Sequence, residues 1–173
     1  SLTSPLADDG ERNPHYIGDH WTTFMDLHVM VFVGFGFLYV FLRAHSWTSL
    51  AFNWLAGSWA FLIGILWIGF WMRVLHSNFE DNMIKLDIKM LVEGNFCAAS
   101  ILIAYGAVLG KLNAYQLLWM ATVQACFYSL NLALCDSVYG STDPGGTIYI
   151  HLFGGAFGVF TSWVYRNPRS DKD

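Results

Sequence analysis

The sequence predicts an all-α integral membrane protein, and its composition and the spacing of its apolar residues support this fold class. Of the 173 residues, 55% are hydrophobic and only 13% are charged, whereas soluble globular chains carry about a quarter charged residues. The hydrophobic residues are gathered into long runs, and a helix needs about 20 such residues to cross a bilayer. Because backbone polar groups in lipid must be satisfied internally, each run is predicted to be a helix.

Five apolar runs follow one another and predict five transmembrane helices. The third run is short by itself and reaches spanning length only if it extends backwards through Met90–Asn95. Short polar segments join the runs, and the longest of them, Arg73–Lys89, is predicted to be an exposed loop. The predicted helices are Phe24–Leu42, Leu50–Met72, Phe96–Leu109, Tyr115–Leu134 and Thr147–Tyr165.

These runs divide the chain into a polar extramembrane segment (residues 1–22), a five-helix membrane domain (23–166) and a charged tail (167–173). The beginning of the chain is polar and is not a signal peptide, so we expect that a preceding segment was removed or that the chain is part of a longer one. An odd number of spans predicts that Ser1 and Asp173 lie on opposite sides of the membrane. Five Lys and Arg on the C-terminal side against four on the other favour a C-terminus in the cytoplasm or matrix.

Several classes of function are not predicted. The net charge is −4 and the nine Lys and Arg are scattered, which argues against a nucleic-acid-binding face. The three cysteines form no CxxC motif or paired framework, so neither a disulfide scaffold nor a metal site is expected. No nucleophile–base pair or cofactor motif is present, and we therefore expect neither an enzyme nor a cofactor.

Asp143 precedes the fifth run and is followed closely by Gly145 and Gly146. A carboxylate at this position can cap the open N–H groups of the helix, or it can favour a cation near a pore mouth, and both roles can hold together. The two glycines allow the backbone to turn sharply and to approach a neighbouring helix closely.

His151 lies inside the fifth run, and an ionisable residue in a membrane helix is a functional hypothesis by default. Gly154 and Gly158 follow it with the spacing of a small-residue face for close helix contact. We therefore expect His151 to point into the helix bundle. Its role is open between a hydrogen bond to a neighbouring helix and contact with a proton or a polar substrate.

Three further residues stand at predicted helix starts. Phe96 opens the third run and is predicted to be either an interfacial anchor or a gate residue. Asp26 and His28 begin the first run and are predicted to be cap and interface residues.

Several motifs together resemble the Rh branch of the Amt/Rh ammonium transporter family. The resemblance extends from about Thr23 to Asn167, nearly the whole chain. The matching stretches are Asp26–Leu38, Phe52–Asn53, Asn95–Ser100, Gly106–Lys111 and Asp143–Gly158.

The resemblance implies a fold of two inverted five-helix repeats that assembles as trimers with one pore per subunit, and this chain is similar only to the first repeat. It also implies that His151 is the first of two pore histidines, that Phe96 belongs to an aromatic gate and that Asp143 is the family's buried aspartate. Asn95 departs from the pattern, because Rh proteins usually carry Asp there.

Two functions from different classes remain open. The chain is expected to be the N-terminal half of an ammonia or ammonium channel, with the second half supplied by another polypeptide or by sequence outside this chain. The alternative is a non-conducting accessory subunit of a larger complex. Membrane lipids are expected partners in either case, and both the plasma membrane and the mitochondrial inner membrane are open as locations.

Overall fold

The computed structural model describes residues 14–41, 46–76 and 86–166, and all regular elements in these ranges are helical. Five helical stretches are long and apolar enough to cross a membrane. The predicted fold class, an all-α membrane protein with five spans, is therefore confirmed. The spans are His20–Val40, Ser46–Leu75, Ile88–Ala107, Ala114–Ser137 and Thr147–Val164.

The first span consists of three helical elements in a row. These are α1 (Pro14–Val29), the π-helix η1 (Met30–Gly34) and α2 (Phe35–Val40). Because α1 begins at Pro14, the prediction that Asp26 and His28 start this helix is wrong. Apolar content marks the part of a helix that suits lipid, whereas polar residues can extend the same helix beyond it.

The second and third spans also extend beyond their predicted bounds. Helix α3 (Ser46–His76) continues into the segment predicted to be a loop, of which residues 77–85 lie outside the described residues. Helix α4 (Ile88–Ala107) begins after Asp87, whose Oδ1 accepts a hydrogen bond from the Met90 backbone N–H at 2.8 Å. Phe96 therefore lies about two turns inside α4, and its predicted place at the start of a helix is wrong.

The last two spans begin in different ways. Helix α5 (Ala114–Ser137) starts with a capping box, in which Asn113 Oδ1 accepts from the Gln116 N–H at 2.9 Å and Gln116 Oε1 accepts from the Asn113 N–H at 3.0 Å. The fifth span starts with the π-helix η2 (Thr147–Leu152) and continues as α6 (Phe153–Val164).

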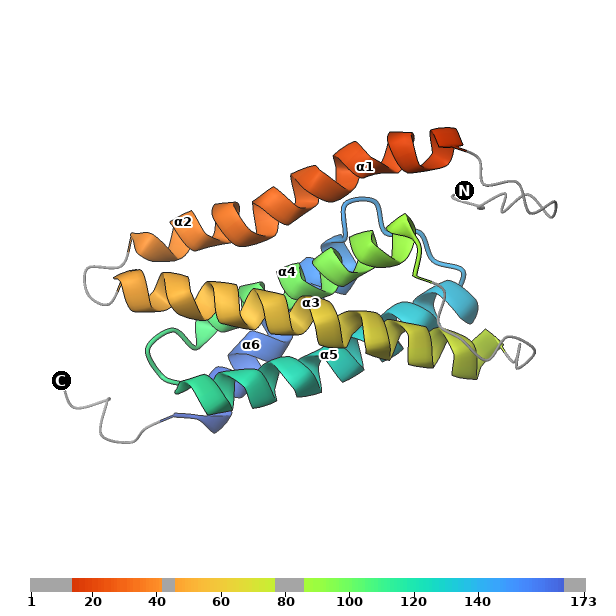
Figure 1. Ribbon diagram of the computed structural model, residues 1–173. Helices are drawn as coiled ribbons and strands as arrows, with labels where there is room; N and C mark the ends of the chain where they lie inside the picture. The colour runs from red at the N-terminus through yellow and green to blue at the C-terminus, as the bar shows by residue number, and fades with distance from the viewer. Residues whose placement is uncertain (1–13, 42–45, 77–85, 167–173) are drawn as a thin grey trace.

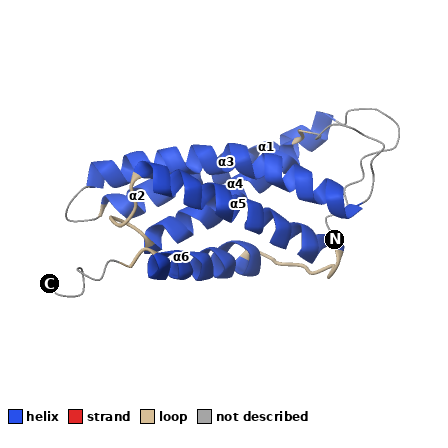
Figure 2. Ribbon diagram, turned by 90° about the horizontal axis from the view of Figure 1, so that it is seen from below, coloured by secondary structure: helices blue, strands red, loops and turns tan. Residues whose placement is uncertain are grey.

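Helix α4 is the centre of the bundle and packs against α1, α3, α5 and α6 (Figure 1). In its spanning window 56% of the residues are buried, compared with 22% in the first and last spans. Small residues such as Gly94, Ala98 and Ala104 line α4 and allow its neighbours to come close. The turned view in Figure 2 shows α6 along one side of the bundle, so α6 has a second face that points away from it.

Along the bundle, α1 begins at one end and α6 ends at the other (Figure 1). We therefore predict that tags placed before residue 14 and after residue 166 lie on opposite faces of the membrane. In sealed vesicles, a protease added outside should remove one tag and leave the other intact until detergent is added. If both tags were cut, or both protected, the five-span topology would be refuted.

Candidate functional site

Helix α6 lies directly against the backbone of α4, because two of the residues that it turns towards α4 have no side chain. A Cβ atom at Gly154 would lie 2.6 Å from the Ser100 carbonyl oxygen, and one at Gly158 would lie 2.8 Å from the Ala104 Cα. Such separations are shorter than van der Waals contact, and backbone atoms cannot move aside as a flexible side chain can. These two glycines therefore define the face of α6 that is turned towards α4.

The chain enters this helix through a turn with two left-handed glycines. Gly145 has a φ of 79° and Gly146 a φ of 67°, which a residue with a Cβ rarely adopts. The Asp143 Oδ2 atom then accepts hydrogen bonds from the N–H groups of Ile148 (2.8 Å) and Tyr149 (2.9 Å). These are two of the N–H groups that a helix start leaves without an intrahelical partner, so the carboxylate holds the first turn of η2.

The wide first turn of η2 also fixes the imidazole of His151. The Gly146 carbonyl oxygen accepts the backbone N–H of Ile150 at 2.9 Å and that of His151 at 3.1 Å. The His151 Nδ1 atom lies 3.0 Å from the same oxygen. Because a carbonyl can only accept, Nδ1 must carry the hydrogen, and in the neutral ring Nε2 then remains a hydrogen-bond acceptor.

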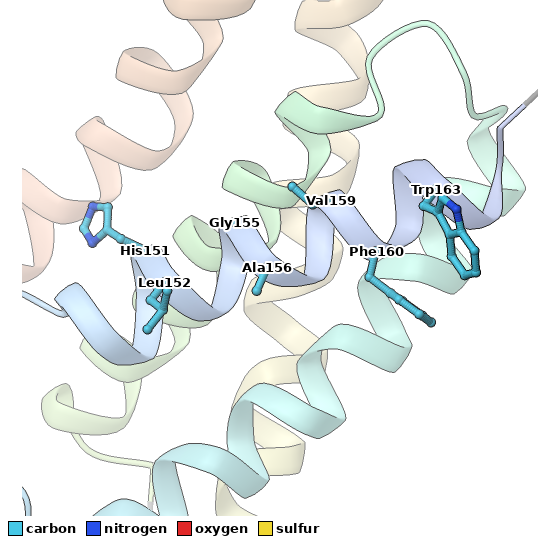
Figure 3. A pocket seen from close by; sticks show the side chains of 7 residues that line it. All are labelled: His151, Leu152, Gly155, Ala156, Val159, Phe160 and Trp163. Atoms are coloured by element: carbon cyan, nitrogen blue, oxygen red, sulfur yellow. The ribbon is translucent and has the colours of Figure 1, made fainter.

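His151 lies on the surface of the five-helix unit, at one end of a shallow groove along α6 (Figure 3). The expectation that it points into this bundle is wrong. The glycines form a narrow contact with α4, whereas His151 in η2 and the groove side of α6 are exposed in the part of the chain that the structure describes. Among the described residues that line the groove, the imidazole is the only ionisable group, and the others are Leu152, Gly155, Ala156, Val159, Phe160 and Trp163.

The structure thus brings Asp143, Gly145, Gly146 and His151 together at the start of the fifth span. Phe96 belongs to another helix, where it is half-buried and packs against the hydrophobic core. Within the described residues, no group of three His, Cys, Asp or Glu side chains is placed to hold a metal ion.

One polar pair was not predicted from the sequence. The His28 Nδ1 atom of α1 lies 3.0 Å from the Asn95 Oδ1 atom of α4. These residues are 67 positions apart and belong to no local motif. A histidine within a long apolar run was the only available signal, and it gave no information about the partner.

Comparison with known proteins agrees with this fold. The family model described as the ammonium transporter family matches residues 12–173. The chain belongs to the ammonium transporter family. It is 42% identical over 152 residues to the ammonium transporter Rh type B of Mus musculus, a match that covers 88% of this chain and 32% of that protein.

A second relative is the ammonium transporter Rh type C of Bos taurus. It is 36% identical over 163 residues, which cover 94% of this chain and 34% of that protein. The similarity to Rh proteins is therefore confirmed. The chain spans about a third of the length of these curated relatives.

Replacing Asp143 by alanine should lower the stability of the protein. The variant loses two bonds to backbone N–H groups, and the loss of a helix cap costs about 0.5–2 kcal/mol. The melting temperature in detergent measures the effect. Asp136→Ala, which removes an exposed carboxylate from the end of α5, is the control and should melt close to the unmodified protein. Equal melting of both variants would show that Asp143 does not hold the helix.

Two adjacent glycines provide a matched test of the contact between α4 and α6. Gly154→Ala should destabilise the protein by about 1–3 kcal/mol, the usual cost of overpacking, because its Cβ would meet the Ser100 carbonyl. Gly155→Ala should be tolerated, since nothing lies within 4 Å of its Cβ position and alanine favours the helix. Thermal unfolding of both variants measures these effects. A lower melting temperature for Gly155→Ala than for Gly154→Ala would contradict the packing of α6 on α4.

Proposed function

We propose that this chain forms one part of the wall of an Rh-type channel for ammonia or ammonium, and that His151 faces its lumen. The observation that carries this proposal is the position of His151 on an exposed, otherwise apolar groove of α6. An imidazole facing lipid is costly, so this face calls for a partner surface. The remaining wall is supplied by sequence outside this chain or by a second polypeptide.

The fixed orientation of the imidazole suits a substrate with N–H groups. The bond from Nδ1 to the Gly146 carbonyl leaves Nε2 as an acceptor, and ammonia and ammonium both carry N–H donors. An apolar lumen strongly disfavours a full charge but accepts a small neutral molecule at far lower cost. Neutral ammonia is therefore the species that passes His151, and the imidazole compensates for part of the hydration that ammonia loses.

Asp143 and Phe96 serve the same path in different ways. Asp143 positions η2, and thereby His151, through its two backbone hydrogen bonds, and the negative charge of its carboxylate attracts a cation. Phe96 acts as an aromatic gate on α4, as the similarity to Rh proteins implies. Because Asn95 is neutral, the attraction of ammonium to this gate is weaker than with a carboxylate at that position.

The same uncovered face supports a second candidate, a non-conducting accessory subunit of a larger membrane complex. Val159, Phe160 and Trp163 are exposed along the groove, and exposed apolar side chains of this size suit contact with another membrane helix. In this case His151 hydrogen-bonds the partner and no substrate passes.

A flux measurement separates the two candidates. In proteoliposomes that contain a pH-sensitive dye, we expect the isolated chain to match empty liposomes, because five helices supply only one side of a lumen. Together with the remainder of the channel, it should accelerate internal alkalinisation after an ammonia pulse. His151→Ala should change that rate, or the selectivity between ammonia and ammonium, because the lumen loses its acceptor.

The control variant is Phe127→Leu on the exposed face of α5, which should conduct like the unmodified protein. Purification from the native membrane then identifies both the membrane and the companion. A companion that supplies a second five-helix half supports transport. Co-purification with an unrelated complex, without such a half, would establish the accessory role.

A further inference from the structure

A buried polar contact joins α1 to α4 immediately before Phe96. Asn95 is fully buried, and its Oδ1 atom lies 3.0 Å from His28 Nδ1. The other amide atom, Nδ2, has no hydrogen-bond partner. Among the described residues, the contact with His28 is thus the only hydrogen bond of this amide, and losing it would leave the whole group buried without a partner, which is unfavourable.

The imidazole of His28 is itself held firmly by aromatic rings. The centroid of its ring lies 5.4 Å from that of Phe24, 4.6 Å from that of Phe32 and 5.8 Å from that of Phe61. These rings come from α1, η1 and α3, so His28 packs against two elements of its own span and against a neighbouring span. The π-helix η1 begins two residues after His28, and such wide turns inside helices are frequently found at functional sites.

The residues around Asn95 are fixed from two sides of α4. Gly94 faces α3, where an added Cβ would lie 2.9 Å from Ile65 Cγ1. Asn95 is bound to α1 through His28. Phe96 is the next residue on the same helical turn, so a rotation of α4 that released Asn95 would also move the Phe96 ring.

We propose that His28 is a positioning residue that acts through Asn95 to fix the orientation of Phe96, and that it thereby sets the size of molecule that passes the gate. This proposal rests on the proposed function for its effect on transport. The positioning itself depends only on the geometry of α1 and α4, and not on transport.

Two substitutions of His28 separate the hydrogen bond from the packing. His28→Phe keeps an aromatic ring among its three neighbours but removes the N–H donor. His28→Asn keeps an amide N–H close to the position of Nδ1 and loses the ring. Asn95→Leu removes the other partner, and Met25→Leu on the exposed face of α1 is the control.

The first measurement is the ¹⁹F NMR resonance of 4-fluorophenylalanine incorporated at position 96 of the full chain. We expect His28→Phe and Asn95→Leu to shift or broaden it in the same way, and the double variant to add nothing further, since coupled residues are not additive. His28→Asn should restore the original resonance, and Met25→Leu should leave it unchanged. An unchanged resonance in His28→Phe would overturn the proposal, even if that variant were less stable.

The second measurement is the ratio of methylamine to ammonia flux through the complete channel, per folded protein. We expect His28→Phe and Asn95→Leu to change this ratio by about threefold or more, within the range of coupling between residues in contact, and His28→Asn to return it towards the original value. A lower yield with an unchanged ratio would overturn the role in selectivity. If the unmodified channel gave no flux at all, the proposed function would fail, while the ¹⁹F result would still decide whether His28 positions Phe96.

Discussion

The position of α6, and of the groove along it, depends on the close contact between α4 and α6. Gly154 lies against the Ser100 carbonyl, and Gly158 lies against the backbone at Ala104. The Ser100 carbonyl also accepts a hydrogen bond from Gln124 Nε2 of α5 at 3.0 Å. The Ser100 carbonyl of α4 therefore contacts both α5 and α6. In lipid, where the hydrophobic effect does not drive helices together, close packing and hydrogen bonds of this kind hold them in contact. Any side chain at Gly154 would push α6 outwards and carry the groove with it.

The orientation of His151 follows from that contact and from the turn that precedes it. The Asp143 carboxylate accepts hydrogen bonds from two N–H groups of η2. The Gly146 carbonyl oxygen accepts hydrogen bonds from two backbone N–H groups and from the imidazole of His151. The left-handed conformation of Gly146 places that carbonyl at the start of the helix. Capping, backbone conformation and the tautomer of His151 are consequently parts of one arrangement, in which the chemistry of the imidazole is set by residues several positions earlier in the chain.

The sequence predicted the features that are encoded locally. Runs of apolar residues gave the number of spans, because transfer into lipid depends on composition. The bounds of the helices were less predictable, because they were placed where the apolar runs end, whereas α1 and α3 continue through polar residues beyond those runs. The direction of His151 was not predictable from Gly154 and Gly158, because a small-residue stripe identifies a contact but not how much of the helix it covers. The pairing of His28 with Asn95 depends on how α1 packs on α4, and no local pattern records it.

The two histidines have similar hydrogen bonds but different surroundings. Each has Nδ1 against an oxygen atom, a backbone carbonyl for His151 and the Asn95 side chain for His28. His28 is packed among the rings of three phenylalanines, whereas His151 is exposed in an apolar groove. A mobile substrate reaches an imidazole only where a face is open to a lumen, so His151 is suited to contact it. The half-buried imidazole of His28 instead contacts Asn95, the direct neighbour of Phe96.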